Sequence, residues 1–151
     1  MSIKSYSNIE TSRKFAITSS DAGDMDGDIV YFGATTSMTA GTIYQYVPDA
    51  EGIAWNLADA DAVANCDGLL AVALGAASDV NGMLLRGMVT LDHDPGAVGD
   101  VLFLSTTAGD ATATAPSGNG DIIRIIGYQV AHASNGLIWF NPDNTFVEVS
   151  A

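Results

Sequence analysis

Apolar and polar residues alternate in short runs along most of this chain. A two-residue period is typical of strands that bury one face, because successive side chains of a strand point to opposite sides. Residues 56–66 are the one segment compatible with a helical turn or two, and they carry no apolar stripe at helical spacing. Runs rich in β-branched and aromatic residues predict strands at 14–19, 28–32, 42–47, 69–74, 83–91, 100–105, 122–130, 137–140 and 145–149.

Turn-forming residues separate these runs, and the Asn135-Gly136 pair predicts a hairpin between the strands on either side. Gly87 and Gly127 stand inside strand runs, where a glycine usually marks a bulge or a barrel corner. Short strands at this spacing favour a curled sheet. We therefore predict an all-β fold, a small β-barrel or sandwich with an extended N-terminal arm. Residues 1–14 would form the arm and residues 15–151 a single β-domain.

The segment 106–120 contains only small and polar residues. Such a segment can form a long hairpin arm or an exposed loop. Loops of this length are uncommon in compact domains unless something covers them. We therefore expect a neighbouring subunit to cover it, and deletion of residues 109–113 to weaken assembly while the monomer still folds.

The charge balance is strongly acidic, with 18 acidic residues against five basic ones and a net charge of −13. Binding to nucleic acid or to an anionic membrane surface needs basic groups, so neither partner is expected. No apolar run reaches the length of a membrane span, and no signal peptide is recognisable, which predicts synthesis in a cytoplasm. Charged residues make up only 15% of the chain. That share indicates either a surface covered in an assembly or simply long polar loops.

Three of the five basic residues, Lys4, Arg13 and Lys14, lie at the start of the chain. The rest of the chain carries nearly all of the acidic groups. A basic arm ahead of an acidic body can dock on an acidic patch of a partner, or on another copy of the same protein. These three residues are therefore the candidate binding residues of the chain.

Asp24, Asp26 and Asp28 resemble the beginning of a calcium-binding loop, because oxygen ligands two residues apart suit a hard cation. The EF-hand pattern places Gly sixth and Glu twelfth, whereas here Gly27 is fourth and Thr35 is twelfth. The favoured interpretation is an acidic turn that leads into the strand at Ile29, with no metal bound.

Candidate catalytic residues are sparse. Asp92-His93-Asp94 places a histidine between two carboxylates, but on a strand His93 would point away from both of them. The single cysteine, Cys66, has no companion motif, which favours a buried structural thiol. Trp55, Trp139 and Phe140 alternate with apolar residues and are assigned to the core rather than to a carbohydrate platform. No phosphate loop, nucleophile elbow or zinc motif is present, so we expect no enzyme activity and no cofactor.

The second half of the chain resembles a β-domain found in virion structural proteins of tailed bacteriophages, both capsid decoration proteins and tail-fibre or tail-tip proteins. The resemblance covers residues 68–149. It is carried by GLLAVALG (68–75), LLRGMVTLDHDPGAVG (84–99), VLFLSTT (101–107), APSGNGDIIRIIGY (115–128) and IWFNPD (138–143).

This resemblance implies a non-enzymatic virion component rather than a particular one. A short acidic chain without a fibre shaft suits a decoration (cement) protein on the outer capsid surface. Such a protein binds the major capsid protein, stabilises the shell and often forms a homo-oligomer, with a trimer as one arrangement. The alternative is a tail-fibre or tail-tip module that binds a host-surface receptor. A small depolymerase would need carboxylates clustered in a groove, and the sequence offers only scattered turn aspartates.

Overall fold

The computed structural model describes residues 21–49, 52–131 and 133–151. One short 3-10 helix, η2 (Val63–Asn65), lies between β3 and β4. The strands in chain order are β1 (Met25–Val30), β2 (Ile43–Asp49), β3 (Gly52–Leu57), β4 (Leu69–Ala73), β5 (Met83–Thr90), β6 (Val101–Leu104), β7 (Ala111–Thr112), β8 (Ile122–Ile123), β9 (Ile125–Ala131), β10 (Leu137–Phe140) and β11 (Val147–Glu148).

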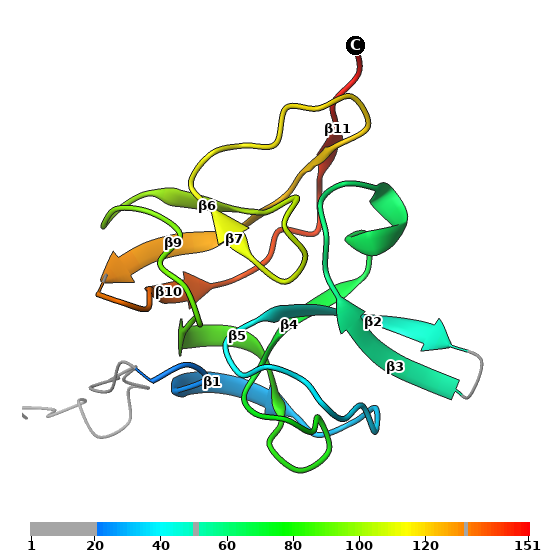
Figure 1. Cartoon of the computed structure of the whole chain (residues 1–151), viewed down its shortest axis with the longest axis vertical. Coiled ribbons are helices and arrows are strands. Elements are labelled where there is room, and N and C mark those ends of the chain that lie inside the picture. The colour runs from blue at the N-terminus through cyan, green and yellow to red at the C-terminus, as the bar shows by residue number, and fades with distance from the viewer. Residues whose placement is uncertain (1–20, 50–51, 132) are drawn as a thin grey trace, which may run out of the picture.

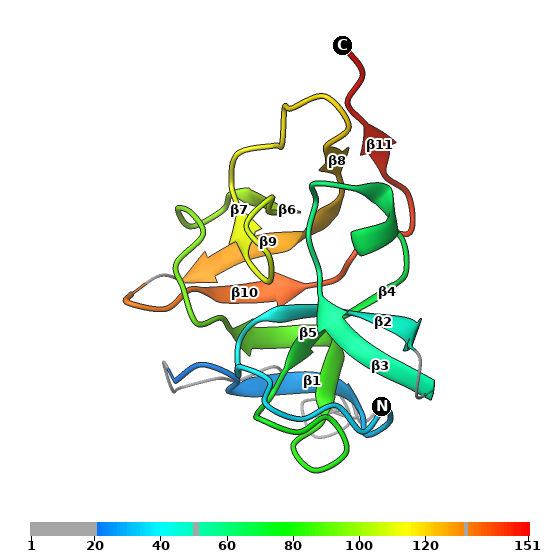
Figure 2. The ribbon, with the colours of Figure 1, turned by 45° about the vertical axis from the view of Figure 1, so that its right-hand side comes forward.

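Nine of these strands form one sheet, whose order is β3-β2-β4-β5-β10-β9-β6-β7 with β1 added on β5. All strand pairs of this sheet are antiparallel. The sheet curls strongly into a half-barrel (Figure 1). Strands β8 and β11 form a separate small ladder beside the C-terminus (Figure 2). The prediction of an all-β, barrel-like fold is therefore confirmed.

Most predicted strands are present, with differences at their ends. The run 122–130 is divided at Arg124 into β8 and β9, and β1 begins at Met25 rather than at Asp28. Strands β3 and β7 were not predicted. Within 56–66, where a helical turn was expected, the structure has η2, and β3 extends to Leu57. The predicted strand 14–19 and the arm 1–14 lie outside the described residues.

The main core lies on the inner face of the curled sheet. Strands β5, β10, β9 and β6 contribute fully buried side chains to it: Leu84, Val89, Ile138, Phe140, Ile126, Leu102 and Leu104. Strands β2 and β4 contribute Ile43, Leu70 and Val72 to the same cluster. Their opposite faces are buried as well, against a second and smaller cluster.

The second cluster centres on Trp55 of β3, which is 2% exposed. The indole Nε1 donates a hydrogen bond of 2.9 Å to the carbonyl oxygen of Phe32. The rings of Phe32 and Tyr46 lie 5.6 and 4.7 Å from that of Trp55. The segment after β1 is thereby held over the β2–β3 hairpin. Trp55 and Phe140 are core residues as predicted, whereas Trp139 is partly exposed on the other face of β10.

Gly87 and Gly127 flank Phe140 in a row across three strands, since Phe140 pairs with Gly87 of β5 and with Gly127 of β9. Gly87 has φ +143°. A Cβ atom there would lie 2.4 Å from the carbonyl oxygen of Asp26, closer than real Cβ contacts allow. The β1–β5 and β6–β9 pairings also shift register near these glycines. The glycines thus allow close backbone approach where the sheet bends, as the sequence predicted.

The segment 106–120 is not a free loop over its first half. Gly109 is buried, its N–H donates to the carbonyl oxygen of Ala58, and its carbonyl accepts from the N–H of Ile43, each at 2.8 Å. Ala111 of β7 belongs to the main core and is 5% exposed. These contacts argue against the expectation that residues 109–113 can be removed from a folded monomer, because residues 111–112 form β7 and Gly109 bonds to two other segments.

Candidate functional site

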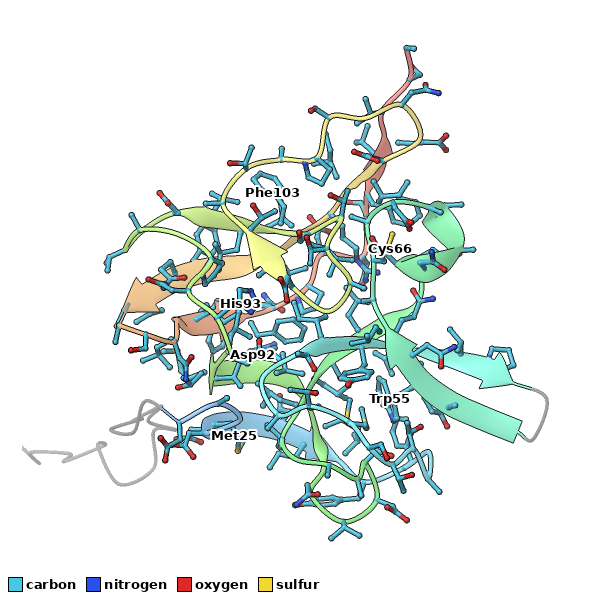
Figure 3. All side chains as sticks on the ribbon, in the orientation of Figure 1. Met25, Trp55, Cys66, Asp92, His93 and Phe103 are labelled. Atoms are coloured by element: carbon cyan, nitrogen blue, oxygen red, sulfur yellow. The ribbon has the colours of Figure 1, made fainter. Side chains whose placement is uncertain are left out.

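The predicted binding residues Lys4, Arg13 and Lys14 lie outside the described residues, so their geometry is not part of the site. In the described part of the chain, one group of side chains has the composition of a metal or catalytic site: Asp92, His93 and Asp110. Asp92 and His93 follow β5, near the middle of the molecule (Figure 3). Asp110 comes from the turn between β6 and β7.

Both ring nitrogens of His93 already have partners. Nδ1 lies 2.8 Å from the carboxylate of Asp92 and 3.6 Å from that of Asp110. Nε2 accepts a hydrogen bond of 3.0 Å from the backbone N–H of Ala111. A backbone N–H can only donate, so Nε2 carries the lone pair and the neutral ring holds its proton on Nδ1.

This arrangement limits what His93 can do chemically. A metal on Nδ1 would displace its proton while Nε2 still accepts from Ala111, which leaves the imidazole without any proton. In an Asp–His hydrolytic pair, the nitrogen remote from the aspartate accepts the proton of the nucleophile. Here that nitrogen is occupied by the Ala111 N–H. The geometry therefore gives His93 a structural task, which is to hold β7 against the end of β5.

The prediction that Asp92, His93 and Asp94 lie on a strand, with His93 pointing away from both carboxylates, was wrong. Asp92 and His93 form a bend after β5, so strand alternation does not separate them. The carboxylate of Asp94 instead accepts a hydrogen bond of 2.8 Å from Nε2 of Gln129. No sequence pattern connects Asp110 with His93. The two meet only because the β6–β7 turn brings Asp110 to His93.

The acidic residues at 24–28 differ from the expected turn. Asp26 and Asp28 lie within β1, opposite Met88 and Arg86 of β5, and Asp24 immediately precedes the strand. The backbone there is extended, which differs from the tightly wound backbone of an EF-hand loop.

Cys66 is fully buried, as the sequence predicted for a structural thiol. Burial raises the pKa of Cys66 to about 11, although the charge of Arg124 works in the opposite direction. The thiol donates to the carbonyl oxygen of Ala62 at 3.4 Å. A thiol in this state is a poor nucleophile.

Arg124 is 4% exposed and is held by main-chain carbonyl oxygens. Its Nε donates to Asp143 at 2.8 Å, and its Nη1 donates to Gly68 at 2.9 Å and also to Cys66. Burial lowers the pKa of Arg124, and the nearby Cys66, Asp143 and Asp67 oppose that shift. The side chain ties the β8–β9 junction to the start of β4 and to the segment after β10.

The outer face of the half-barrel carries a row of apolar side chains across four strands. Met88 of β5 pairs with Trp139 of β10, Trp139 pairs with Tyr128 of β9, and Tyr128 pairs with Val101 of β6. Tyr128 is 49% exposed and the other three are partly exposed. We call these four residues the outer row. Val130, on the same strand as Tyr128, is 41% exposed.

An exposed apolar row of this kind is typical of a protein–protein contact, because large apolar side chains gain most when a partner removes them from water.

In the described residues, no helix is long and apolar enough to cross a lipid bilayer. The chain matches no model of a known protein family, and no curated protein or solved structure is significantly similar to it.

Proposed function

We propose that this chain is a non-enzymatic structural protein of a tailed-phage particle, a capsid decoration protein that binds the major capsid protein and stabilises the shell. The observation that carries the proposal is the outer row, an apolar band on an otherwise acidic chain. The sequence resemblance at 68–149 supports the choice of a virion component. The four strands that carry the outer row all lie within that segment.

The state of His93 supports a role without catalysis. The one mixed His–carboxylate group in the described residues has its basic nitrogen engaged by the backbone of Ala111. The buried Cys66, with its raised pKa, offers no reactive thiolate. Binding through repeated copies on a shell needs no single strong contact, because many weak contacts add by avidity.

Removal of apolar side chains from the outer face tests this function. The double variant Tyr128→Ser/Val130→Ser should bind capsids more weakly, measured by cosedimentation with purified capsids that lack the protein. The matched control is Tyr31→Ser/Val80→Ser, because Tyr31 and Val80 are 58% and 72% exposed but lie outside β9. Wild-type occupancy by the first variant would remove the outer face from the interface.

The number of copies per particle separates the capsid from the tail. Quantitative mass spectrometry of purified virions should find a number comparable with that of the major capsid protein. A handful of copies would instead identify a tail-fibre or tail-tip module that binds a host receptor. Complete absence from virions would overturn the proposal.

A further inference from the structure

Both Lys or Arg residues in the described part of the chain, Arg86 and Arg124, line one pocket of about 560 Å³. The pocket lies where β5 changes partners. Residues 83–84 of β5 pair with β4, and residues 87–90 pair with β10. Between these two pairings β4 and β10 separate, and the gap is bordered by Leu85 and Arg86. A pocket of this volume falls within the range of small-molecule sites.

Arg124 contributes unused donors to this pocket. A guanidinium has five N–H groups, and the carbonyl oxygens of Asp143, Cys66 and Gly68 use those on Nε and Nη1. Nη2 has no hydrogen-bond partner among the described residues, and it is not among the fully enclosed atoms. The side chain is 4% exposed. The bonds of Nε and Nη1 therefore hold the guanidinium in place at the wall of the pocket, with the donors of Nη2 unused.

Arg86 supplies the second guanidinium that lines the pocket. Its charge lies over the ring of Trp139, 5.8 Å from the centroid, which limits how the side chain can turn. Three acidic groups are near. Asp67 lines the pocket, Asp143 is close enough to act on the charge of Arg124, and Asp28 pairs with Arg86 across β1 and β5 without lining the pocket. With two guanidinium groups and these carboxylates nearby, the pocket suits a monoanion better than a dianion, because Asp67 repels each added negative charge.

The remaining walls are of two kinds. Leu69, Leu85 and Pro142 form an apolar side, and Asn141 and Asn144 offer side-chain amides. Leu69 is 45% exposed, which is unusual for a leucine at the start of a buried strand. An apolar wall beside fixed cationic donors is the arrangement that binds an organic acid.

We propose that this pocket binds a small organic carboxylate, with the carboxylate on Nη2 of Arg124 and on Arg86, and its apolar body against Leu69, Leu85 and Pro142. The site goes beyond the proposed capsid-binding role and adjoins the outer row, because Arg86 lies over the ring of Trp139. It uses the region beside β4 and the segment after β10, whereas the outer row crosses β5, β10, β9 and β6.

A titration of the full chain with sodium benzoate, followed by ¹H–¹⁵N NMR, tests the proposal. Benzoate should shift the amides of Gly68 and Leu69, the side-chain amide of Asn144 and the indole N–H of Trp139. Benzamide, which has the same shape without the charge, should leave them in place. The proposal is overturned if benzamide shifts them equally. It is also overturned if about 10 mM benzoate, well beyond a millimolar dissociation constant, shifts none of them.

Two variants test the charges without disturbing the buried clamp. Arg86→Gln removes the exposed guanidinium and Asn144→Asp adds a repelling carboxylate, so each should weaken benzoate binding by about two- to fivefold, the range of exposed ion pairs. Asn56→Asp is the matched control, because it adds the same charge at an exposed residue that does not line the pocket. Affinity equal to that of the wild type in both Arg86→Gln and Asn144→Asp would refute the assignment.

Discussion

Gly127 and Trp139 approach each other so closely that a Cβ atom on Gly127 would lie 1.8 Å from the carbonyl oxygen of Trp139. No side-chain rotation relieves such a contact, because the obstructing atom belongs to the backbone of β10. The β9–β10 pairing therefore requires glycine at this position. The φ of +154° adds to that requirement.

Gly127→Ala should destabilise the fold by about 3 kcal/mol or more, because the two strands must separate to admit a methyl group. Urea denaturation measures the loss. Gly99→Ala is the matched control: Gly99 also has a positive φ, of +92°, but nothing lies within 4 Å of its Cβ position. It should cost only about 1 kcal/mol, the conformational strain alone. Similar losses in both variants would contradict the close-approach argument.

Arg124→Ala should cost about 3 kcal/mol or more, because three buried carbonyl interactions lose their donor and a cavity remains. The control is Arg86→Ala, which removes the same side chain from an exposed position. Its effect on the urea midpoint should be below about 1 kcal/mol. Equal effects would show that burial does not distinguish the two arginines.

His93→Ala should destabilise the fold by about 1–3 kcal/mol, since the N–H of Ala111 loses its acceptor in a buried position. Hydrogen exchange at Ala111 should accelerate more than exchange in β4, which identifies a local effect on β7. Asp92→Asn serves as the comparison, because it leaves the Nε2 contact in place. An unchanged exchange rate at Ala111 would exclude the structural role of His93.

The raised pKa of Cys66 predicts that the folded state loses stability at alkaline pH. Its pKa is raised from 9.0 in the unfolded chain to about 11 in the folded state, so the folded state holds the thiol proton more tightly. The stability contribution is complete below pH 9.0 and declines as the pH rises from there toward about 11. The wild type should lose stability relative to Cys66→Ala over that window. A constant difference between the two across the window would show that the thiol pKa is not raised.

The arm prediction can be tested by removing residues 1–14. The shortened chain should keep its β-domain, checked by circular dichroism, and should no longer decorate capsids. Charge reversal at Lys4, Arg13 and Lys14 should produce part of the same loss, and wild-type binding should weaken with salt, because exposed ion pairs are screened. Full occupancy by the shortened chain would place the contacts on the β-domain itself.

The sequence was most informative where strands are rich in β-branched residues and bounded by Asn-Gly or Pro-Gly turns, as around β5, β9 and β10. It failed at β3, whose Gly52, Ala54 and Asn56 are weak strand formers. Pairing with β2, with Trp55 opposite Tyr46, makes that segment a strand. Local propensity does not contain such a contact.

The sites were less accessible to sequence reasoning than the strands. Asp110 meets His93 only because the β6–β7 turn returns to the end of β5. The burial of Arg124 could not be predicted, because an arginine within an apolar run suggests an exposed position on a strand. Its burial depends on carbonyl oxygens of Cys66 and Gly68, more than fifty residues earlier in the chain. Both groups depend on tertiary contacts between distant segments.

The clamp around Arg124 also bears on how long a folded molecule survives. Its acceptors come from the segment before β4 and the segment after β10, so it closes only when both are already in position. Contacts made after the transition state govern the rate of unfolding and leave the rate of folding nearly unchanged. We therefore expect the hydrogen bonds of Arg124 to slow unfolding, and so to lengthen the lifetime of the native state, while the folding rate changes little.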